Sequence, residues 1–98
     1  MNVTMTHNDS ELTVAIEGRL DTLTAPELEE QLEPELDEAE KLTFDMEGLE
    51  YISSAGLRVL LTAQKMMNAQ GEMYITGCSE DILDIFEITG FSQILTLK

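Results

Sequence analysis

The sequence predicts a single α/β domain with a mixed β-sheet, and three observations point to this fold class. The chain has 98 residues, enough for one hydrophobic core. Stretches with alternating apolar residues, typical of half-buried strands, are interleaved with stretches of helical apolar spacing. The turn signal Asn8-Asp9-Ser10 separates the first two strand-like stretches and predicts an antiparallel hairpin, whereas strands joined through helices pair in parallel.

The hairpin is predicted over Val3 to His7 and Leu12 to Ile16, where apolar and polar residues alternate. Gly18-Arg19-Leu20-Asp21 closes its second strand. The next segment, from Thr24 onward, has the composition of an amphipathic helix. The hairpin is therefore expected to lead directly into this helix.

The first helix has recognisable start signals. Thr24 is suited to the N-cap, Pro26 to the first turn, and Glu27 to a capping box. Pro34 removes one backbone hydrogen bond, so we expect it to kink or restart the helix near Glu33. Apolar residues recur every four positions, at Leu28, Leu32 and Leu36. Acidic residues fill the remainder and predict a solvated face rather than a dedicated binding patch: Glu27, Glu29, Glu30, Glu33, Glu35, Asp37, Glu38 and Glu40.

The rest of the chain continues the alternation of strand and helix. We expect strands over 41–46, 72–76 and 94–97, with a turn over 47–50. We expect helices from the serine pair at 53–54 to about 70 and from 79 to 89, ended by Gly71 and Gly90. The predicted order is β-β-α-β-α-β-α-β, with the helices packed on the sheet.

Composition excludes several classes of function. The formal net charge of −15 repels nucleic acid and anionic membrane surfaces and favours partners with a basic face. The single Cys78 excludes an intramolecular disulfide and suits a reducing compartment. Cys78 and the single His7 lack the spacing of a zinc motif, so we expect no metal and no cofactor. With no apolar run long enough to cross a bilayer and no signal peptide, we expect a cytoplasmic protein with no membrane partner.

The stretch Tyr51-Ile52-Ser53-Ser54-Ala55-Gly56-Leu57 predicts a strand end, a tight turn and a helix start. A serine oxygen at this position can accept from the free N–H groups of the first helical turn. The small Ala55 and Gly56 leave the serines open to a partner protein. A phosphate added there would lie at the positive end of the helix dipole. An ordinary N-cap without further function is the alternative interpretation.

Three stretches of the chain, taken together, resemble the STAS domain family and, within it, the single-domain anti-sigma factor antagonists. They are Gly18-Arg19-Leu20-Asp21 followed by Thr24-Ala25, then Phe44-Asp45 through Leu57, and finally Ile85 to Phe91. They stand in the family's order and spacing. The resemblance covers residues 1–98 as one STAS domain.

This resemblance implies a protein-binding module controlled by phosphorylation. In the family, a helix-initiating serine is phosphorylated by a partner serine kinase that is also the anti-sigma factor. The unphosphorylated antagonist binds that kinase and frees the sigma factor, and a serine phosphatase restores it. The matching acceptor here is Ser54, and the free protein is expected to be a monomer. The implied partner-binding residues are Asp21, Thr24, Ser53, Ser54, Ala55, Gly56, Leu57 and Arg58.

The sequence departs from the family pattern in two places and leaves alternatives open. Ser53 stands where the motif has an acidic residue, and Arg19 stands where an acidic residue is common. Ser53 is therefore an alternative acceptor. A constitutive STAS scaffold, or a sensory or transport-associated module without a phosphoserine switch, is the alternative function.

Enzymatic and other switching functions lack the residues that they need. A hydrolase with Ser54 as nucleophile would need a nearby base, and the single His7 lies on a predicted strand near the N-terminus. A receiver-type role for Asp45 would need an acidic pair after the first strand, and the chain has none there. Nucleotide binding would need a glycine loop that cradles the phosphates, and the sequence contains no such loop. We therefore expect the protein not to be an enzyme.

Overall fold

The computed structural model describes residues 1–98, and it contains the predicted N-terminal hairpin. Strands β1 (Asn2–Asn8) and β2 (Glu11–Leu20) are antiparallel. Asp9 turns the chain between them with a φ of 56°, a left-handed conformation that aspartate adopts more readily than most residues. β2 continues past the predicted Ile16 to Leu20, because its second half pairs with a further strand.

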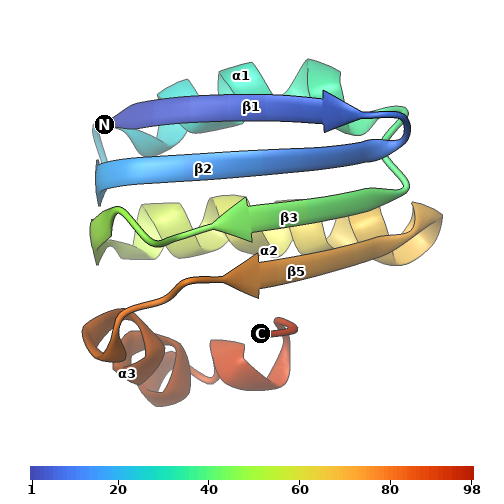
Figure 1. Ribbon diagram of the computed structural model, residues 1–98. Helices are drawn as coiled ribbons and strands as arrows, with labels where there is room; N and C mark the ends of the chain where they lie inside the picture. The colour runs from blue at the N-terminus through green and yellow to red at the C-terminus, as the bar shows by residue number, and fades with distance from the viewer.

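Three parallel strands complete the sheet. β3 (Lys41–Asp45) pairs with the first half of β2, and β4 (Leu49–Ile52) pairs with the second half. β5 (Glu72–Thr76) pairs with β3 on its other side. Figure 1 shows the resulting order β1-β2-β3-β5. The predicted mixed sheet is confirmed. The pairing of β2 with both β3 and β4 is a feature that the sequence did not predict.

The sequence pattern does not predict β4 as a separate strand. The residue pattern predicts a turn over Glu47 to Glu50, with only Tyr51-Ile52 extended after it. In the structure the two ends of β4, Leu49 and Ile52, are buried, while the two residues between them are exposed. This spacing does not produce the period-two alternation by which half-buried strands are recognised. Pairing with β2 therefore defines β4 more than its local sequence does.

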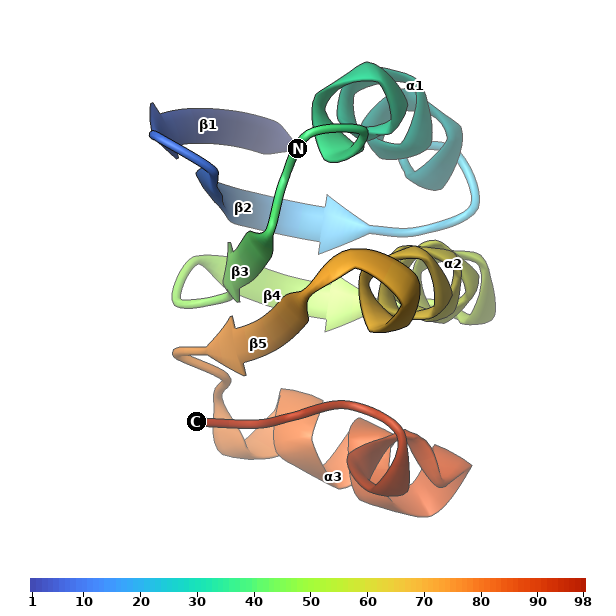
Figure 2. The ribbon, with the colours of Figure 1, turned by 90° about the vertical axis from the view of Figure 1, so that its right-hand side faces the viewer.

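Two helices cover one face of the sheet. Figure 2 shows α1 (Ala25–Leu36) and α2 (Ser54–Gln70) side by side on that face, and α3 (Glu80–Thr89) beyond β5. The hydrophobic core is a cluster of 24 buried residues, among which Phe44 and Phe86 have no solvent exposure. No helix lies over the opposite face of the sheet. The predicted packing of helices on the sheet is thus confirmed.

The end of α2 agrees with the prediction in position but not in mechanism, and α1 differs from the prediction at Pro34. α1 continues through Pro34 to Leu36 as one helix, so of the kink or restart predicted near Glu33 the restart does not occur. Leu36 is buried, and its carbonyl accepts a hydrogen bond from the Gln70 side chain. The burial and the hydrogen bond together hold the last turn of α1.

α2 ends at Gly71, which is extended (φ 173°) rather than left-handed. A Cβ there would collide with the carbonyl oxygen of Glu40, so this position requires glycine because of a close approach.

The C-terminal segment differs from the prediction after α3. Ser79 caps α3 through its side chain, and Gly90 ends it with a φ of 83°, both as predicted. The strand predicted over 94–97 is wrong, because only Leu97 makes a β-bridge, to Ile75, and the 3₁₀-helix η1 (Phe91–Gln93) comes directly before this segment. The carbonyl of Phe91 accepts from the N–H groups of Ile94 and Leu95, so the turn that follows η1 continues into the predicted strand. No helix of the structure combines the length and the apolar composition needed to span a membrane.

Candidate functional site

The predicted site lies where β2 and β4 end side by side. Leu20 pairs with Ile52 in parallel, and the N–H of Ser53 donates to the carbonyl of Leu20 at 2.9 Å. Figure 2 shows both strands pointing the same way, β2 leading to α1 and β4 leading to α2. The loop at residues 21–24 and the start of α2 are therefore neighbours, although about thirty residues separate them in sequence.

The two serines have different positions at the start of α2. Ser53 is the N-cap, with extended backbone, and its hydroxyl accepts from the N–H of Gly56 at 3.4 Å. Ser54 is the first helical residue and is exposed, whereas Ser53 is half-buried. The first N–H groups of a helix have no intrahelical partner, and the Ser53 hydroxyl binds only one of them. The Ser54 hydroxyl thus faces solvent beside a helix N-terminus.

The residues after Ser54 divide into a buried and an exposed set. Gly56 and Leu57 are buried, and Leu57 is only 6% exposed. A Cβ at Gly56 would lie 2.8 Å from the Leu20 side chain and 2.9 Å from the Leu20 carbonyl oxygen, so α2 packs closely on β2 there. Ala55 is half-buried and Arg58 is exposed. Gly56 and Leu57 therefore position the helix start, and the surface next to Ser54 comes from Ala55 and Arg58.

A dense hydrogen-bond network holds the loop that precedes α1. The carboxylate of Asp21 accepts from the N–H groups of Leu23 at 3.0 Å and Thr24 at 3.1 Å. The hydroxyl of Thr24 accepts from the N–H of Asp21 and donates to the carbonyl of Arg19, both at 2.8 Å. These bonds make the loop a rigid turn.

This network also explains why the predicted capping box is absent. Thr24 is the N-cap of α1 by position, but its hydroxyl makes no capping bond. Glu27 could only bind the N–H of Thr24, and Asp21 already occupies that group. The hydrogen bond from the Thr24 backbone is the main reason why the pKa of Asp21 is lowered from its ordinary 3.8. Asp21 is consequently ionised at neutral pH.

Arg19 and Tyr51 form an exposed pair beside the same loop, and neither is among the predicted partner-binding residues. They are opposite each other in the β2–β4 pairing, and the Arg19 guanidinium carbon lies 4.3 Å from the centroid of the Tyr51 ring. The Arg19 Nε is also 3.8 Å from the carboxylate of Asp21. Arg19 is already visible in the sequence as a departure from the family pattern, but its contact with Tyr51 depends on a strand pairing that the local pattern does not predict.

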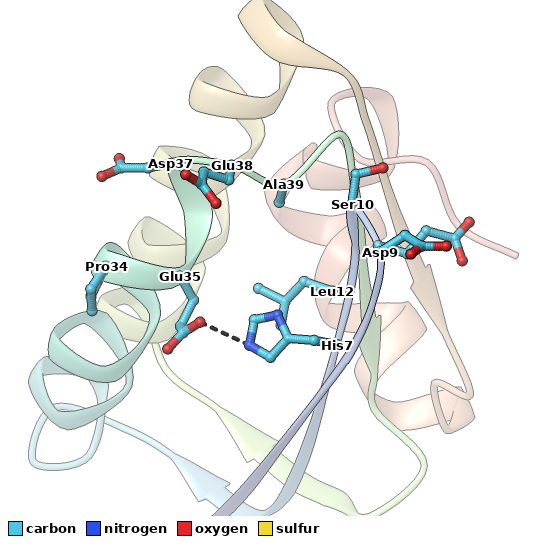
Figure 3. A pocket seen from close by; sticks show the side chains of 10 residues that line it. His7, Asp9, Ser10, Leu12, Pro34, Glu35, Asp37, Glu38 and Ala39 are labelled. Carbon is cyan, nitrogen blue, oxygen red and sulfur yellow. Dashed lines mark ion pairs between the residues drawn. The ribbon is translucent and has the colours of Figure 1, made fainter.

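The remaining reactive groups lie elsewhere. Burial raises the pKa of the half-buried Cys78 thiol to about 11, so this residue is a neutral thiol at physiological pH. Figure 3 shows an acidic hollow between the β1–β2 turn and the end of α1, with His7 Nε2 2.8 Å from the Glu35 carboxylate. Ser54 is not among the residues that line this hollow. No group of three or more His, Cys, Asp and Glu residues is arranged to hold a metal ion.

Comparison with known proteins finds relatives by sequence and by fold. An anti-sigma-B factor antagonist of Staphylococcus aureus is 35% identical over 97 residues, which cover 97% of this chain and 90% of that protein. An anti-sigma factor antagonist from Mycobacterium paratuberculosis has a similar crystal structure, with a TM-score of 0.89 and 21% identity over 98% of this chain and 83% of the other.

The SpoIIAA protein of Bacillus, solved in a phosphorylated form, has a TM-score of 0.78 and 13% identity, covering 99% of this chain and 91% of that one. At these identities the two solved structures show that the fold is shared. The model of the STAS domain matches residues 2–98, almost the whole chain. The sequence match to the Staphylococcus relative extends over nearly the same range. The chain therefore belongs to the STAS domain family.

Proposed function

We propose that this protein is an anti-sigma factor antagonist that is switched by phosphorylation of Ser54. The observation that carries the proposal is the exposed Ser54 at the first position of α2, directly after the Ser53 cap. The partner class comes from the relatives, since the Staphylococcus aureus protein is named an anti-sigma-B factor antagonist. The partner would be an anti-sigma factor with serine kinase activity, and a serine phosphatase would reverse the modification.

Because the acceptor is exposed, a phosphate can be added without a change in the fold, and its effect falls on binding. A phosphate adds about −1.5 to −2 charges at pH 7. At the surface of the free protein those charges are solvated and lie at the favourable N-terminus of α2. In a protein interface they would have to be desolvated or paired, and an unpaired buried charge costs several kcal/mol. Each 1.4 kcal/mol changes the affinity about tenfold, so one phosphate can end binding without altering the fold.

The replacement of the family's acidic residue by Ser53 leaves the helix start intact. Ser53 caps α2 through its hydroxyl, a role for which serine and aspartate are about equally suited. The same bond engages the Ser53 oxygen, whereas Ser54 is more exposed. This difference favours Ser54 over Ser53 as the acceptor.

The contact surface that we propose consists of the exposed and half-buried residues around Ser54. Asp21 and Thr24 come from the loop before α1, and Ala55 and Arg58 come from α2. Gly56 and Leu57 would contribute through the position that they give to Ser54, since both are buried. In this proposal the chain is a regulatory binding protein, a monomer when free and not an enzyme.

The proposal is tested with purified anti-sigma factors from the source genome, each mixed with the protein in turn. Binding is measured by calorimetry without ATP, and phosphate incorporation with ATP is located by mass spectrometry. We expect one anti-sigma factor to bind the protein and to label Ser54. Ser54→Ala should bind with similar affinity and remain unlabelled, since alanine is well accepted in the first turn of a helix.

Ser53→Asn is the matched control, because asparagine retains a capping oxygen but has no hydroxyl to phosphorylate. It should still be labelled at Ser54. Labelling that persists in Ser54→Ala and disappears in Ser53→Asn would move the acceptor to Ser53. Binding without any phosphorylation would instead indicate a constitutive STAS scaffold.

A further inference from the structure

The loop between β2 and α1 presents an apolar side chain that the fold itself does not use. Leu23 is 83% exposed, and among the large hydrophobic residues only Ile88, at 85%, is as exposed. A solitary exposed leucine needs no explanation by itself. Leu23 differs because of the rigidity of the loop that holds it and because of its place next to Ser54.

The rigidity of the loop follows from its hydrogen bonds. The N–H of Leu23 donates to the Asp21 carboxylate, the N–H of Asp21 donates to the Thr24 hydroxyl, and the N–H of Ala25 donates to the Asp21 carbonyl. The Leu23 side chain takes no part in this network. The loop backbone thus presents Leu23 in an exposed position.

The place of Leu23 follows from the pairing of β2 and β4. Leu23 is three residues after Leu20, whose carbonyl accepts from Ser53, the residue directly before Ser54. At the end of β2, Arg19 contacts both the Tyr51 ring and the Asp21 carboxylate. An exposed leucine, an exposed aromatic ring and the acceptor serine therefore all come from segments that adjoin the junction of these two strands.

We propose that Leu23 is the apolar anchor by which this protein binds its anti-sigma factor and distinguishes it from others. The partner would have an apolar pocket for Leu23, bordered by basic residues that face the ionised Asp21 and suit the net charge of −15. Because hydrogen bonds already hold the loop backbone, little backbone entropy is lost when Leu23 binds, which makes such an anchor effective. This inference rests on the proposed function.

The test compares Leu23→Ser with Ile88→Ser, a matched control with nearly equal exposure on α3. Both variants should fold, since neither residue belongs to the core, and thermal melting checks this. Affinity is measured against the anti-sigma factor that binds the unchanged protein. We expect Leu23→Ser to bind about tenfold or more weakly, mainly through faster dissociation. Ile88→Ser should stay within about twofold, and Leu23→Met should restore most of the affinity.

The outcomes separate this inference from the proposed function. If the unchanged protein binds an anti-sigma factor and Leu23→Ser binds equally well, Leu23 is not an anchor while the proposed function stands. Equal losses in Leu23→Ser and Ile88→Ser would also overturn the inference, because they would reflect surface hydrophobicity in general. If the unchanged protein binds none of the anti-sigma factors, the proposed function fails and the inference fails with it.

Discussion

At the scale of single residues, the proposed site combines an exposed serine with neighbours whose chemistry is determined by their hydrogen bonds. Ser53 and Ser54 are adjacent and identical in type, yet one hydroxyl caps α2 and the other faces solvent. Asp21 organises a loop through its carboxylate, whereas Cys78 is a neutral thiol because it is half-buried. The position of each group, more than its residue type, decides what it can do.

Protonation of Asp21 should loosen the loop before α1. Its folded pKa lies below the ordinary 3.8, so the ionised form contributes to stability above pH 3.8, and this contribution is lost as the pH falls through the folded value. Asp21→Asn retains an oxygen for the same backbone bonds but does not titrate. The melting temperature of Asp21→Asn should therefore fall less steeply with acid than that of the unchanged protein. Asp84→Asn, at an exposed aspartate of α3, is the control, and its melting temperature should fall with acid as steeply as that of the unchanged protein. Equal acid sensitivity of all three proteins would contradict the role of Asp21.

Cys78 should react slowly with thiol reagents. With a pKa of about 11, roughly 0.1% of this thiol is ionised at pH 8, compared with about a quarter for a free thiol of pKa 8.5. We expect alkylation by iodoacetamide to be on the order of two hundredfold slower than that of free cysteine. The rate should rise as the pH approaches 11 and should reach the reference value in urea. A fast reaction of the folded protein at pH 8 would show that the thiol is accessible and activated.

At the scale of secondary-structure elements, the site depends on how closely α2 approaches the end of β2. Gly56 is the point of contact, since its missing side chain leaves room for the Leu20 carbonyl. The hydrogen bond from Ser53 to Leu20 connects the same two elements. The start of α2 is thereby held against the sheet, and this contact positions Ser54.

Gly56→Ala should destabilise the protein and disturb the position of Ser54. The new Cβ would lie 2.9 Å from a backbone carbonyl that cannot move without breaking the β2–β4 pairing. Overpacking of this kind typically costs about 1–3 kcal/mol, measurable by urea denaturation. Gly48→Ala is a suitable control, because its Cβ would mainly meet the Glu17 side chain, which can rotate away. If both substitutions had equally small effects, the close approach at Gly56 would not be a structural requirement.

At the scale of the whole molecule, the predicted phosphorylation site and the acidic hollow are built from different parts of the chain. The hollow in Figure 3 lies between the β1–β2 turn and the end of α1, whereas Ser54 follows the end of β4. Most acids of α1, including Glu29, Glu30 and Glu33, are exposed, which agrees with the predicted solvated face. The field of a chain with a net charge of −15 acts on any basic partner before contact is made.

Neutralising part of the acidic face of α1 should slow association with a basic partner and leave dissociation nearly unchanged. In Glu29/Glu30/Glu33→Gln the long-range attraction is weaker, and this attraction acts mainly on the association rate. Since the Debye length is about 8 Å at physiological salt, the association rate of the parent should depend more on salt than that of the variant. Stopped-flow or surface-based kinetics across salt concentrations test this. A large rise in the dissociation rate, with the fold intact, would show that the acidic face is itself a contact surface.

Local sequence alone determined most elements of this fold. The hairpin turn at Asn8-Asp9-Ser10, the caps at Ser53 and Ser79, and the left-handed Gly90 are each encoded within a few residues, because caps and turns depend on short-range hydrogen bonds and backbone preferences. The same holds for the place of Ser54 at a helix start.

Only the tertiary structure decided what depends on residues far apart in the chain. β4 is a strand because β2 pairs with it, and residues 94–97 make only one β-bridge, from Leu97 to Ile75, although their apolar spacing suits a strand. Asp21, rather than Glu27, occupies the N–H of Thr24, so the capping box does not form. The loop carrying Leu23 comes to lie beside Ser54 for the same reason that β4 exists: the hydrogen bonds between β2 and β4 connect backbone groups about thirty residues apart, and no local pattern specifies them.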